Sequence, residues 1–268
     1  MSYQFIEVEV DNYIATLSLA RTKSLNALNV PFVTEITDAV RALNTRNDVR
    51  VIIVNSNARV FCVGLDLRDF KALELIDSEA KSTYYLKDKA QAFFDCSNIL
   101  ERCRKPVIAA VHSFCVGGGL DIACACDIRL CTEDALFCLK EAAVNIVADM
   151  GVLQRLPLIV GQGFAREMAF TARNYSAKEA ERMGLVNAVY PDRETLLSEA
   201  KKLAVQIAEN APLAIMGTKE VLNYSRTASV EDGMDMSIQK NCLLFLSKDS
   251  HEAFAAFSEN RKPKFKGE

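Results

Sequence analysis

The chain has 268 residues, of which 50% are hydrophobic and 25% are charged, the composition of an ordinary folded protein. Its 32 Lys and Arg residues nearly balance its 35 Asp and Glu residues, and a net charge of −3 gives no field that would collect polyanions, so general nucleic-acid binding is not expected. No stretch approaches the roughly 20 apolar residues of a membrane-spanning helix, and the length supports one large domain or two small ones.

The 9 cysteines, most of them set among apolar residues, predict free thiols in an intracellular protein rather than a disulfide framework. A structural metal site is not expected, because no C-x-x-C pair occurs and His112 and His251 are the only histidines. His112 follows an apolar strand without a Ser or Cys nucleophile pattern, which indicates a core residue rather than a base. Neither end of the sequence carries a readable targeting signal.

The first elements alternate between strand and helix. Residues 5–10 and 13–19 alternate apolar and polar side chains around Asp11-Asn12, which predicts an antiparallel hairpin. Apolar residues then recur three and four positions apart from Pro31 to Leu43, which predicts an amphipathic helix with proline in its first turn. The apolar run Val51–Val54 follows and predicts a buried strand.

The same order repeats in the middle of the chain. A long helical segment of about residues 76 to 103 precedes the apolar strand Pro106–Val111, a glycine turn and the short helix Leu120–Ala125. Strands that alternate with helices in this way predict an α/β core.

Toward the C-terminus the strand signals nearly vanish, apart from Gly184–Val189, and helical periods dominate. The pattern Ser176-Ala-Lys-Glu179 predicts a capping box at the start of a short helix, and Ser229-Val-Glu-Asp232 predicts a similar start. The chain is therefore divided into an α/β core over residues 1–200 and a helical region over residues 201–268, which packs on the core or on a neighbouring subunit.

Three consecutive glycines, Gly117–Gly119, follow a buried strand and open a helix. Such glycines leave backbone N–H groups uncovered at the positive end of the helix dipole, where negative charge is stabilised. The turn lacks the patterns of a nucleotide P-loop and of a dinucleotide fold, so an oxyanion hole is the functional interpretation. The alternative is that the glycines only permit tight packing of the helix on the strand.

A second loop, Arg59–Leu67, also follows a buried strand and would present another backbone N–H beside Gly64, and two donors from separate loops suffice for an oxyanion hole. With both loops in place, the sequence resembles the crotonase superfamily, also called the enoyl-CoA hydratase/isomerase family. Matching motifs occur in order along nearly the whole chain: Lys23–Leu28, Phe61–Leu67, Lys105–Val111, Gly117–Asp121, Ala125–Arg129 and Glu259–Phe265.

The resemblance implies a crotonase fold, a ClpP-like α/β spiral of ββα units with a C-terminal helical region that trimerises, in a homotrimer or homohexamer. It also implies an acyl-CoA thioester substrate, with coenzyme A as part of that substrate and no metal or separate cofactor. The thioester oxygen would accept hydrogen bonds from the backbone N–H groups of Leu65 and Gly118, and one such donor contributes about 3 to 4 kcal/mol to enolate stabilisation. The implied substrate-binding residues are Phe61, Cys62, Val63, Gly64, Leu65, Gly118 and Gly119.

Three carboxylates belong to the predicted site: Asp121, Glu141 and Asp149. Enoyl-CoA hydratases carry glutamate at the positions that match Asp121 and Glu141, and those two glutamates handle the water that adds across the double bond. Asp121 is one methylene shorter and is not expected to reach that water. Asp149 lies where hydratases usually have small residues and glycine.

The set of three carboxylates resembles the Δ3,5-Δ2,4-dienoyl-CoA isomerase subgroup, and so do the stretches Cys115–Asp121, Ala148–Pro157 and Ala169–Arg173. The resemblance implies an isomerase of unsaturated fatty-acid β-oxidation, in which Glu141 exchanges the C2 proton, Asp149 protonates C6, and Asp121 positions and polarises the site. Two bases suit this reaction because C2 and C6 lie several bonds apart. A fatty, water-poor pocket would raise the pKa values of these carboxyl groups.

Simpler interpretations of single residues stay open. An acid such as Asp149 in a helix-rich segment is ordinarily a solvated surface group, and Glu141 would form an exposed ion pair with the preceding lysine. Asp127 is interpreted as a structural partner for nearby backbone or for Arg129. The basic end, Arg261–Lys266, is either a solvated tail or a contact for the phosphates of coenzyme A.

The alternative activities are those of a 2-enoyl-CoA hydratase or of a Δ3-Δ2-enoyl-CoA isomerase that uses only Glu141, and Asp149 discriminates between them and a dienoyl-CoA isomerase. A further hypothesis is a non-catalytic acyl-CoA-binding or RNA-binding member of the fold. RNA binding is not expected, because acidic residues interrupt the cations between Lys81 and Lys105. The resemblance implies a mitochondrial or peroxisome-like compartment if the source is eukaryotic, whereas acyl-chain length and the choice between trimer and hexamer are not fixed by the sequence.

Overall fold

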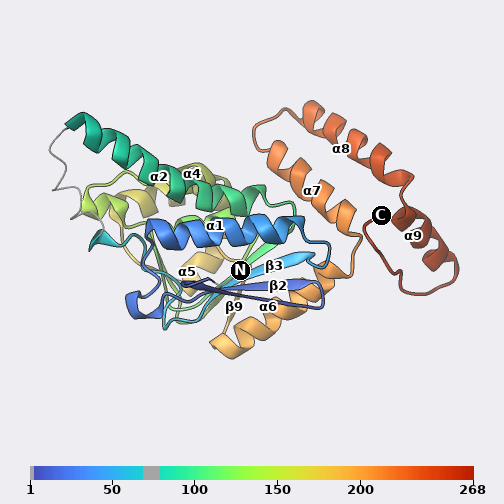
Figure 1. Ribbon diagram of the computed structural model, residues 1–268, viewed down its shortest axis with the longest axis horizontal. Helices are drawn as coiled ribbons and strands as arrows, with labels where there is room; N and C mark the ends of the chain where they lie inside the picture. Colours follow the sequence, from blue (N-terminus) through green and yellow to red (C-terminus); the bar gives the residue numbers. More distant parts are fainter. Residues whose placement is uncertain (1–2, 69–78) are drawn as a thin grey trace.

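The computed structural model describes residues 3–68 and 79–268 (Figure 1). Its centre is a 6-stranded sheet in which β1 and β2 are antiparallel and the later neighbours are parallel. The hairpin predicted around Asp11-Asn12 is confirmed. In spatial order the strands are β1 (Ile6–Asp11), β2 (Ile14–Leu19), β3 (Val51–Ser56), β4 (Val107–Val111), β6 (Ile128–Thr132) and β9 (Ala188–Tyr190).

A second sheet of 3 strands contains β5 (Phe114–Val116), β7 (Leu136–Cys138) and β8 (Tyr175–Ser176). The sequence predicts none of these strands, because two or three residues are too few to show a period. It also misses β6, whose alternation includes an arginine. Arg129 is buried there because its guanidinium donates hydrogen bonds to the carbonyls of Leu185 and Cys126.

Four helices lie on one side of the large sheet and share its buried core: α1 (Val30–Thr45), α2 (Glu79–Arg102), α3 (Gly118–Ala125) and α4 (Val152–Thr171). Of these, α2 packs on α1 and α3, and α4 packs on α3. Asn29 starts α1 by accepting a hydrogen bond from the N–H of Phe32 (3.2 Å), and the predicted apolar face of α1, including Ile36 and Val40, is buried. α2 confirms the predicted long helix, although residues 76–78 of that prediction lie outside the described residues. No described helix is long and apolar enough to cross a membrane.

The opposite face of the sheet is covered by α6 (Arg193–Ala208). Ala200 and Ala204 of this helix share a buried cluster with Ile53 and Ile108 of the sheet. The predicted division at residue 200 therefore falls inside a helix that packs on the α/β core. The short α5 (Ala177–Arg182) opens with the predicted capping box, in which Ser176 and Glu179 bond each other's backbone N–H groups.

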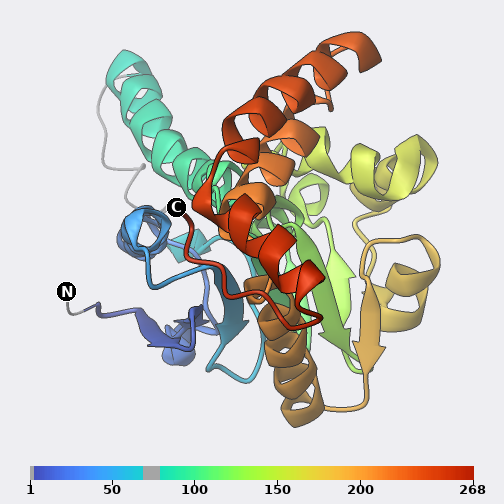
Figure 2. The same ribbon diagram turned by 90° about the vertical axis from the view of Figure 1, so that its right-hand side faces the viewer.

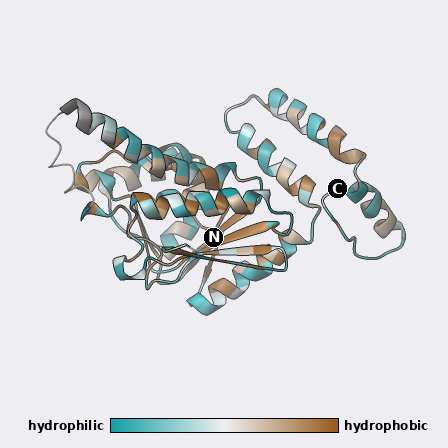
Figure 3. Ribbon diagram, viewed as in Figure 1, coloured by the Kyte–Doolittle hydropathy of each residue, from teal (hydrophilic) through white to brown (hydrophobic). Residues whose placement is uncertain are grey.

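The C-terminal helices α7 (Pro212–Tyr224), α8 (Val230–Phe245) and α9 (Lys248–Ser258) lie beside the α/β core rather than on the sheet (Figures 1 and 2). Ser229 caps α8 as predicted, by accepting a hydrogen bond from the N–H of Asp232. Figure 3 shows hydrophobic residues along the strands of the large sheet and also on α8. Leu243 and Leu246 at the end of α8 are 76% and 84% exposed, respectively.

A buried ion pair joins α7 to the core. Lys219 of α7 is 6% exposed, and its ammonium group donates to a carboxylate oxygen of Asp127 at 2.6 Å. The same oxygen accepts the N–H of Val107 at 2.7 Å, so the predicted structural role of Asp127 with backbone is confirmed, while its charged partner is Lys219 rather than Arg129. This pair holds the helical region to the start of β4.

Removing the charge of Lys219 is expected to destabilise the fold. Lys219→Met leaves the Asp127 carboxylate partly buried without its cation, and breaking a buried pair from one side typically lowers the free energy of unfolding by about 3 to 5 kcal/mol. Urea denaturation followed by circular dichroism measures the change. Lys201→Met is the matched control, because Lys201 pairs with Asp11 on the surface and its side chain is 60% exposed. Equal stability losses for the two variants would contradict the expectation.

Candidate active site

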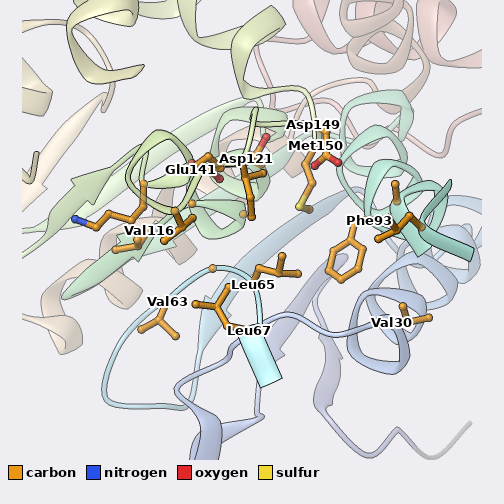
Figure 4. A pocket seen from close by; sticks show the side chains of 18 of the residues that line it. Val30, Val63, Leu65, Leu67, Phe93, Val116, Asp121, Glu141, Asp149 and Met150 are labelled. Atoms are coloured by element: carbon orange, nitrogen blue, oxygen red, sulfur yellow. The ribbon is translucent and has the colours of Figure 1, made fainter. Parts of the chain in front are cut away.

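A pocket of about 470 Å³ opens between the loop after β3, the glycine turn before α3, the middle of α2 and the segment that precedes α4 (Figure 4). Its walls are mostly apolar and include Val30, Leu67, Phe93 and Met150. The pocket is also lined by the three carboxylates singled out in the sequence, Asp121, Glu141 and Asp149. The structure therefore brings all three predicted acids to one cavity.

The loop after β3 is held so that one backbone donor remains unused. The N–H of Leu28 donates to the carbonyl of Gly64 (2.7 Å), and the N–H of Asp66 donates to the carbonyl of Leu28 (2.8 Å), which leaves the intervening N–H of Leu65 outside the ladder. Gly64 is required at this bend because its φ is +87° and a Cβ there would lie 2.9 Å from the carbonyl oxygen of Val116. The two predicted loops thus meet at Gly64.

The glycine turn supplies the second donor. Gly117 has a φ of +53° and precedes Gly118, the first residue of α3, whose N–H has no acceptor within the helix. Across residues 3–68 and 79–268, the N–H groups of Leu65 and Gly118 are both without a hydrogen-bond acceptor, and both residues line the pocket. The predicted packing role of the glycines also applies, since a Cβ at Gly119 would lie 2.8 Å from the Cβ of Cys62.

Asp121 lies in the first turn of α3 and is 1% exposed. One of its carboxylate oxygens accepts the N–H of Val152 at 2.7 Å, where α4 begins. Burial, reinforced by the nearby charge of Glu141, raises the pKa of Asp121 to about 8. At neutral pH the Asp121 side chain is therefore mostly protonated and uncharged.

Glu141 begins a 3₁₀ turn, η3 (Glu141–Val144), and faces the glycine turn. Its Oε1 lies 3.1 Å from the position that a Cβ on Gly117 would occupy. Its Oε2 is buried and accepts no hydrogen bond from the described residues, and burial raises its pKa. The ammonium group of Lys140 donates to the carbonyl of Ala172 (3.4 Å) and not to Glu141, so the alternative of an exposed ion pair between these neighbours is wrong.

Asp149 lies in the loop that leads into α4, beside Met150 (Figure 4). The side chain keeps contact with solvent at the pocket, and partial burial raises its pKa. In the view of Figure 4, Asp121 and Glu141 are neighbours above Leu65, whereas Asp149 lies toward Phe93. When Asp149 is ionised, its charge contributes to raising the pKa values of Asp121 and Glu141, so the three groups share one electrostatic environment.

Three of the predicted substrate-binding residues lie behind the pocket lining. Phe61 and Cys62 are fully buried, and Gly119 packs against Cys62, whereas Val63, Gly64, Leu65 and Gly118 line the cavity. The Cys62 thiol donates to the carbonyl of Asn26 (3.0 Å) and lies 3.4 Å from the N–H of Gly64, so it supports the loop.

The apolar lining is the part of the site that the sequence does not identify. It comes from three separate parts of the chain, represented by Val30, Phe93 and Met150. In the sequence, each of these apolar residues is indistinguishable from an ordinary core residue. His112 is a core residue as predicted, with Nε2 3.0 Å from the carbonyl oxygen of Ala58. In the described part of the chain, no group of three or more His, Cys, Asp or Glu side chains is arranged to hold a metal ion.

The buried state of Asp121 predicts a pH-dependent stability difference. The folded chain holds a proton on Asp121 up to about pH 8, whereas an unfolded aspartic acid loses it near the ordinary pKa of 3.8, so this group destabilises the fold progressively as pH rises between these values. Asp121→Asn removes the effect and keeps an acceptor for the N–H of Val152. As pH increases, the free energy of unfolding of this variant should therefore rise relative to that of wild type, by up to about 1.4 kcal/mol per pH unit. Thermal melts of wild type and Asp121→Asn at about pH 5, about pH 6.5 and about pH 8 test this. A difference in melting temperature that stays constant with pH would refute it.

Comparison with known proteins places this site in a family. A model of the enoyl-CoA hydratase/isomerase family matches residues 9–268. The chain belongs to this family. The resemblance found in the sequence and the predicted crotonase fold are thereby confirmed, whereas the trimerisation expected of the C-terminal region stays a prediction.

Curated relatives and solved structures match over nearly the full chain. The sequence is 40% identical to a protein of Arabidopsis thaliana named peroxisomal Δ3,5-Δ2,4-dienoyl-CoA isomerase, with 98% of each chain covered. It is 37% identical to a human protein named mitochondrial Δ3,5-Δ2,4-dienoyl-CoA isomerase, with 98% of this chain and 82% of the human one covered. The structure superposes on an enoyl-CoA hydratase from Bacillus anthracis with a TM-score of 0.91 at 30% identity, covering 99% of this chain and 100% of the other.

Proposed function

We propose that the protein isomerises 3,5-dienoyl-CoA thioesters to 2,4-dienoyl-CoA thioesters. The observation that carries the proposal is the convergence of Asp121, Glu141 and Asp149 on one apolar pocket beside two unused backbone N–H groups. The relatives named dienoyl-CoA isomerase support it, because the match extends over nearly the whole chain.

Glu141 acts as the base in the first step. The C2–H bond breaks, its proton passes to Glu141, and the electron pair spreads along the diene to the thioester oxygen. The N–H groups of Leu65 and Gly118 stabilise the charge that develops on that oxygen. The raised pKa of Glu141 makes its carboxylate a stronger base than an exposed glutamate would be.

Asp149 completes the reaction as an acid at the far end of the diene. It gives a proton to C6, and the electron pair returns from the oxygen to form the new C6–H bond, so the double bonds move from C3 and C5 to C2 and C4. Solvent then removes the proton from Glu141 and returns one to Asp149, whose side chain keeps contact with water. Asp121, mostly protonated at neutral pH, adds little negative charge beside Glu141.

A pair of parallel assays tests the proposal. In one, the wild-type protein receives a 3,5-dienoyl-CoA and the ultraviolet absorbance of the conjugated 2,4-dienoyl thioester is followed. In the other, hydration of a 2-enoyl-CoA is followed by loss of its absorbance. The proposal expects isomerisation to be much faster than hydration. Hydration without isomerisation would show that the protein is a hydratase, the alternative activity.

The assembly and the compartment are also proposals. Three large apolar side chains of the C-terminal region, Val230, Leu246 and Phe257, are 81%, 84% and 88% exposed in the single chain. Burying them between subunits supports a homotrimer or homohexamer formed through this region, which light scattering of the purified protein measures. The relatives named peroxisomal and mitochondrial support either compartment in a eukaryotic source.

A further inference from the structure

The loop that carries Asp149 is held by side chains that lie outside the pocket. The carbonyl of Met150, the next residue, accepts two hydrogen bonds: from the hydroxyl of Ser97 on α2 at 2.5 Å and from Nη1 of Arg155 on α4 at 3.0 Å. Arg155 is 6% exposed, and neither Ser97 nor Arg155 lines the pocket. The peptide between Met150 and Gly151, one residue after Asp149, is therefore held from outside the pocket.

The bend after Met150 depends on the same arginine. Gly151 has a φ of +102°, and a Cβ there would collide with Nη1 of Arg155, so the backbone lies directly over the guanidinium group. The next N–H, that of Val152, donates to the carboxyl group of Asp121 at 2.7 Å. Residues 149–152 thus begin at Asp149, bend over the guanidinium group of Arg155 and end at the hydrogen bond from Val152 to Asp121.

Arg155 is itself oriented by α2. Its Nη2 donates to the side-chain oxygen of Asn98 and to Oε2 of Glu101, both at 2.7 Å. The other carboxylate oxygen of Glu101 pairs with Arg226, which follows α7, and the amide of Asn223 donates to the Glu101 carbonyl at 3.1 Å. A chain of ion pairs, Arg226–Glu101–Arg155, therefore starts in the C-terminal helical region. The hydrogen bond from Arg155 to the Met150 carbonyl links it to the loop of Asp149.

We propose that Arg155 is the positioning residue for Asp149, and that Glu101 makes this positioning depend on the docking of the C-terminal helices by pairing with both Arg155 and Arg226. The proposal rests on the proposed function, because it assigns Asp149 the proton delivery at C6. A displacement of about 1 Å in a reacting group lowers turnover by as much as about 100-fold. In the described structure, Glu141 and the donors Leu65 and Gly118 form no hydrogen bond or ion pair with Arg155, Glu101 or Arg226.

Two variants and one control test the proposal. Arg155→Lys keeps the positive charge but cannot bond Met150, Asn98 and Glu101 together. Arg226→Met interrupts the chain of ion pairs at its outer end, where the arginine side chain is 39% exposed, and leaves the pocket lining intact. Arg166→Met is the matched control, because Arg166 is an exposed arginine of α4.

The readouts separate positioning from general damage. Arg155→Lys is expected to lower kcat for dienoyl isomerisation by about 30- to 100-fold and Arg226→Met by about 3- to 10-fold, while exchange of the C2 hydrogen with deuterated water, which needs only Glu141, stays within about twofold. Arg166→Met should change neither rate. Equal losses of isomerisation and C2 exchange, or unchanged isomerisation in both test variants, would overturn the proposal.

A measurement without substrate keeps this inference separate from the proposed function. Hydrogen exchange at the amide of Val152 reports whether the loop from Asp149 to Asp121 is held, and it should be faster in Arg155→Lys and Arg226→Met than in wild type and Arg166→Met. If wild type shows no isomerisation, the proposed function fails, and faster exchange would still support the loop contact. Unchanged exchange in both test variants would reject the positioning role whatever the reaction is.

Discussion

Replacing Glu141 with glutamine is expected to abolish most of the activity, lowering kcat for dienoyl isomerisation by about 1,000-fold. The glutamine side chain keeps the size and the buried position of Glu141 but cannot accept the C2 proton. Exchange of the C2 hydrogen with deuterated water should fall by a similar factor, because both processes begin with the same proton transfer. Absorbance assays and mass spectrometry of the recovered thioester measure the two rates.

The control for Glu141→Gln is Glu9→Gln, which makes the same chemical change at an exposed position on β1. It should leave both rates unchanged. A Glu141→Gln protein that folds normally and retains a tenth or more of the wild-type rate (about a 10-fold loss or less) would mean that another group removes the C2 proton.

Replacing Asp149 with asparagine is expected to separate the two halves of the reaction. Isomerisation should fall by about 100-fold or more, since no acid remains to protonate C6. Exchange at C2 should stay within about twofold of wild type, because Glu141 and the donors Leu65 and Gly118 are untouched. This split between exchange and turnover distinguishes a two-base isomerase from a simpler enoyl-CoA isomerase that uses only Glu141.

Asp235→Asn, on the exposed surface of α8, is the matched control for Asp149→Asn and should behave as wild type. Isomerisation at the wild-type rate in Asp149→Asn would make Asp149 a bystander. A parallel loss of C2 exchange and isomerisation would instead indicate that the substitution disturbs the whole pocket.

Much of the fold follows from local sequence patterns. The hairpin at Asp11-Asn12, the helix from Pro31, and the capping box at Ser176 are each determined by periodicity or by a capping side chain close in the sequence. The second sheet is different, because β5, β7 and β8 are too short to carry a period and exist through pairing between distant segments. The place of α6 on the sheet is likewise a tertiary contact that residue 200 as a boundary misses.

The acids of the site could be predicted, but the surroundings that give them their chemistry could not. Motif resemblance locates Asp121, Glu141 and Asp149 along the chain. The buried contact of Asp121 with Val152, the orphaned oxygen of Glu141 and the hydrogen bonds of Arg155 behind Asp149 depend on residues far apart in sequence. No period or spacing records such contacts, which is why Arg155 is absent from the sequence-based site.

The most direct test of the account follows a labelled hydrogen through one turnover. A 3,5-dienoyl-CoA carrying deuterium at C2 is converted in ordinary water, and the position of deuterium in the 2,4-dienoyl product is determined by nuclear magnetic resonance. If Glu141 removes the C2 proton and Asp149 supplies another, the new hydrogen at C6 comes from solvent and C6 carries no deuterium. Deuterium transferred from C2 to C6 would show that one group serves both carbons and would contradict the two-carboxylate mechanism.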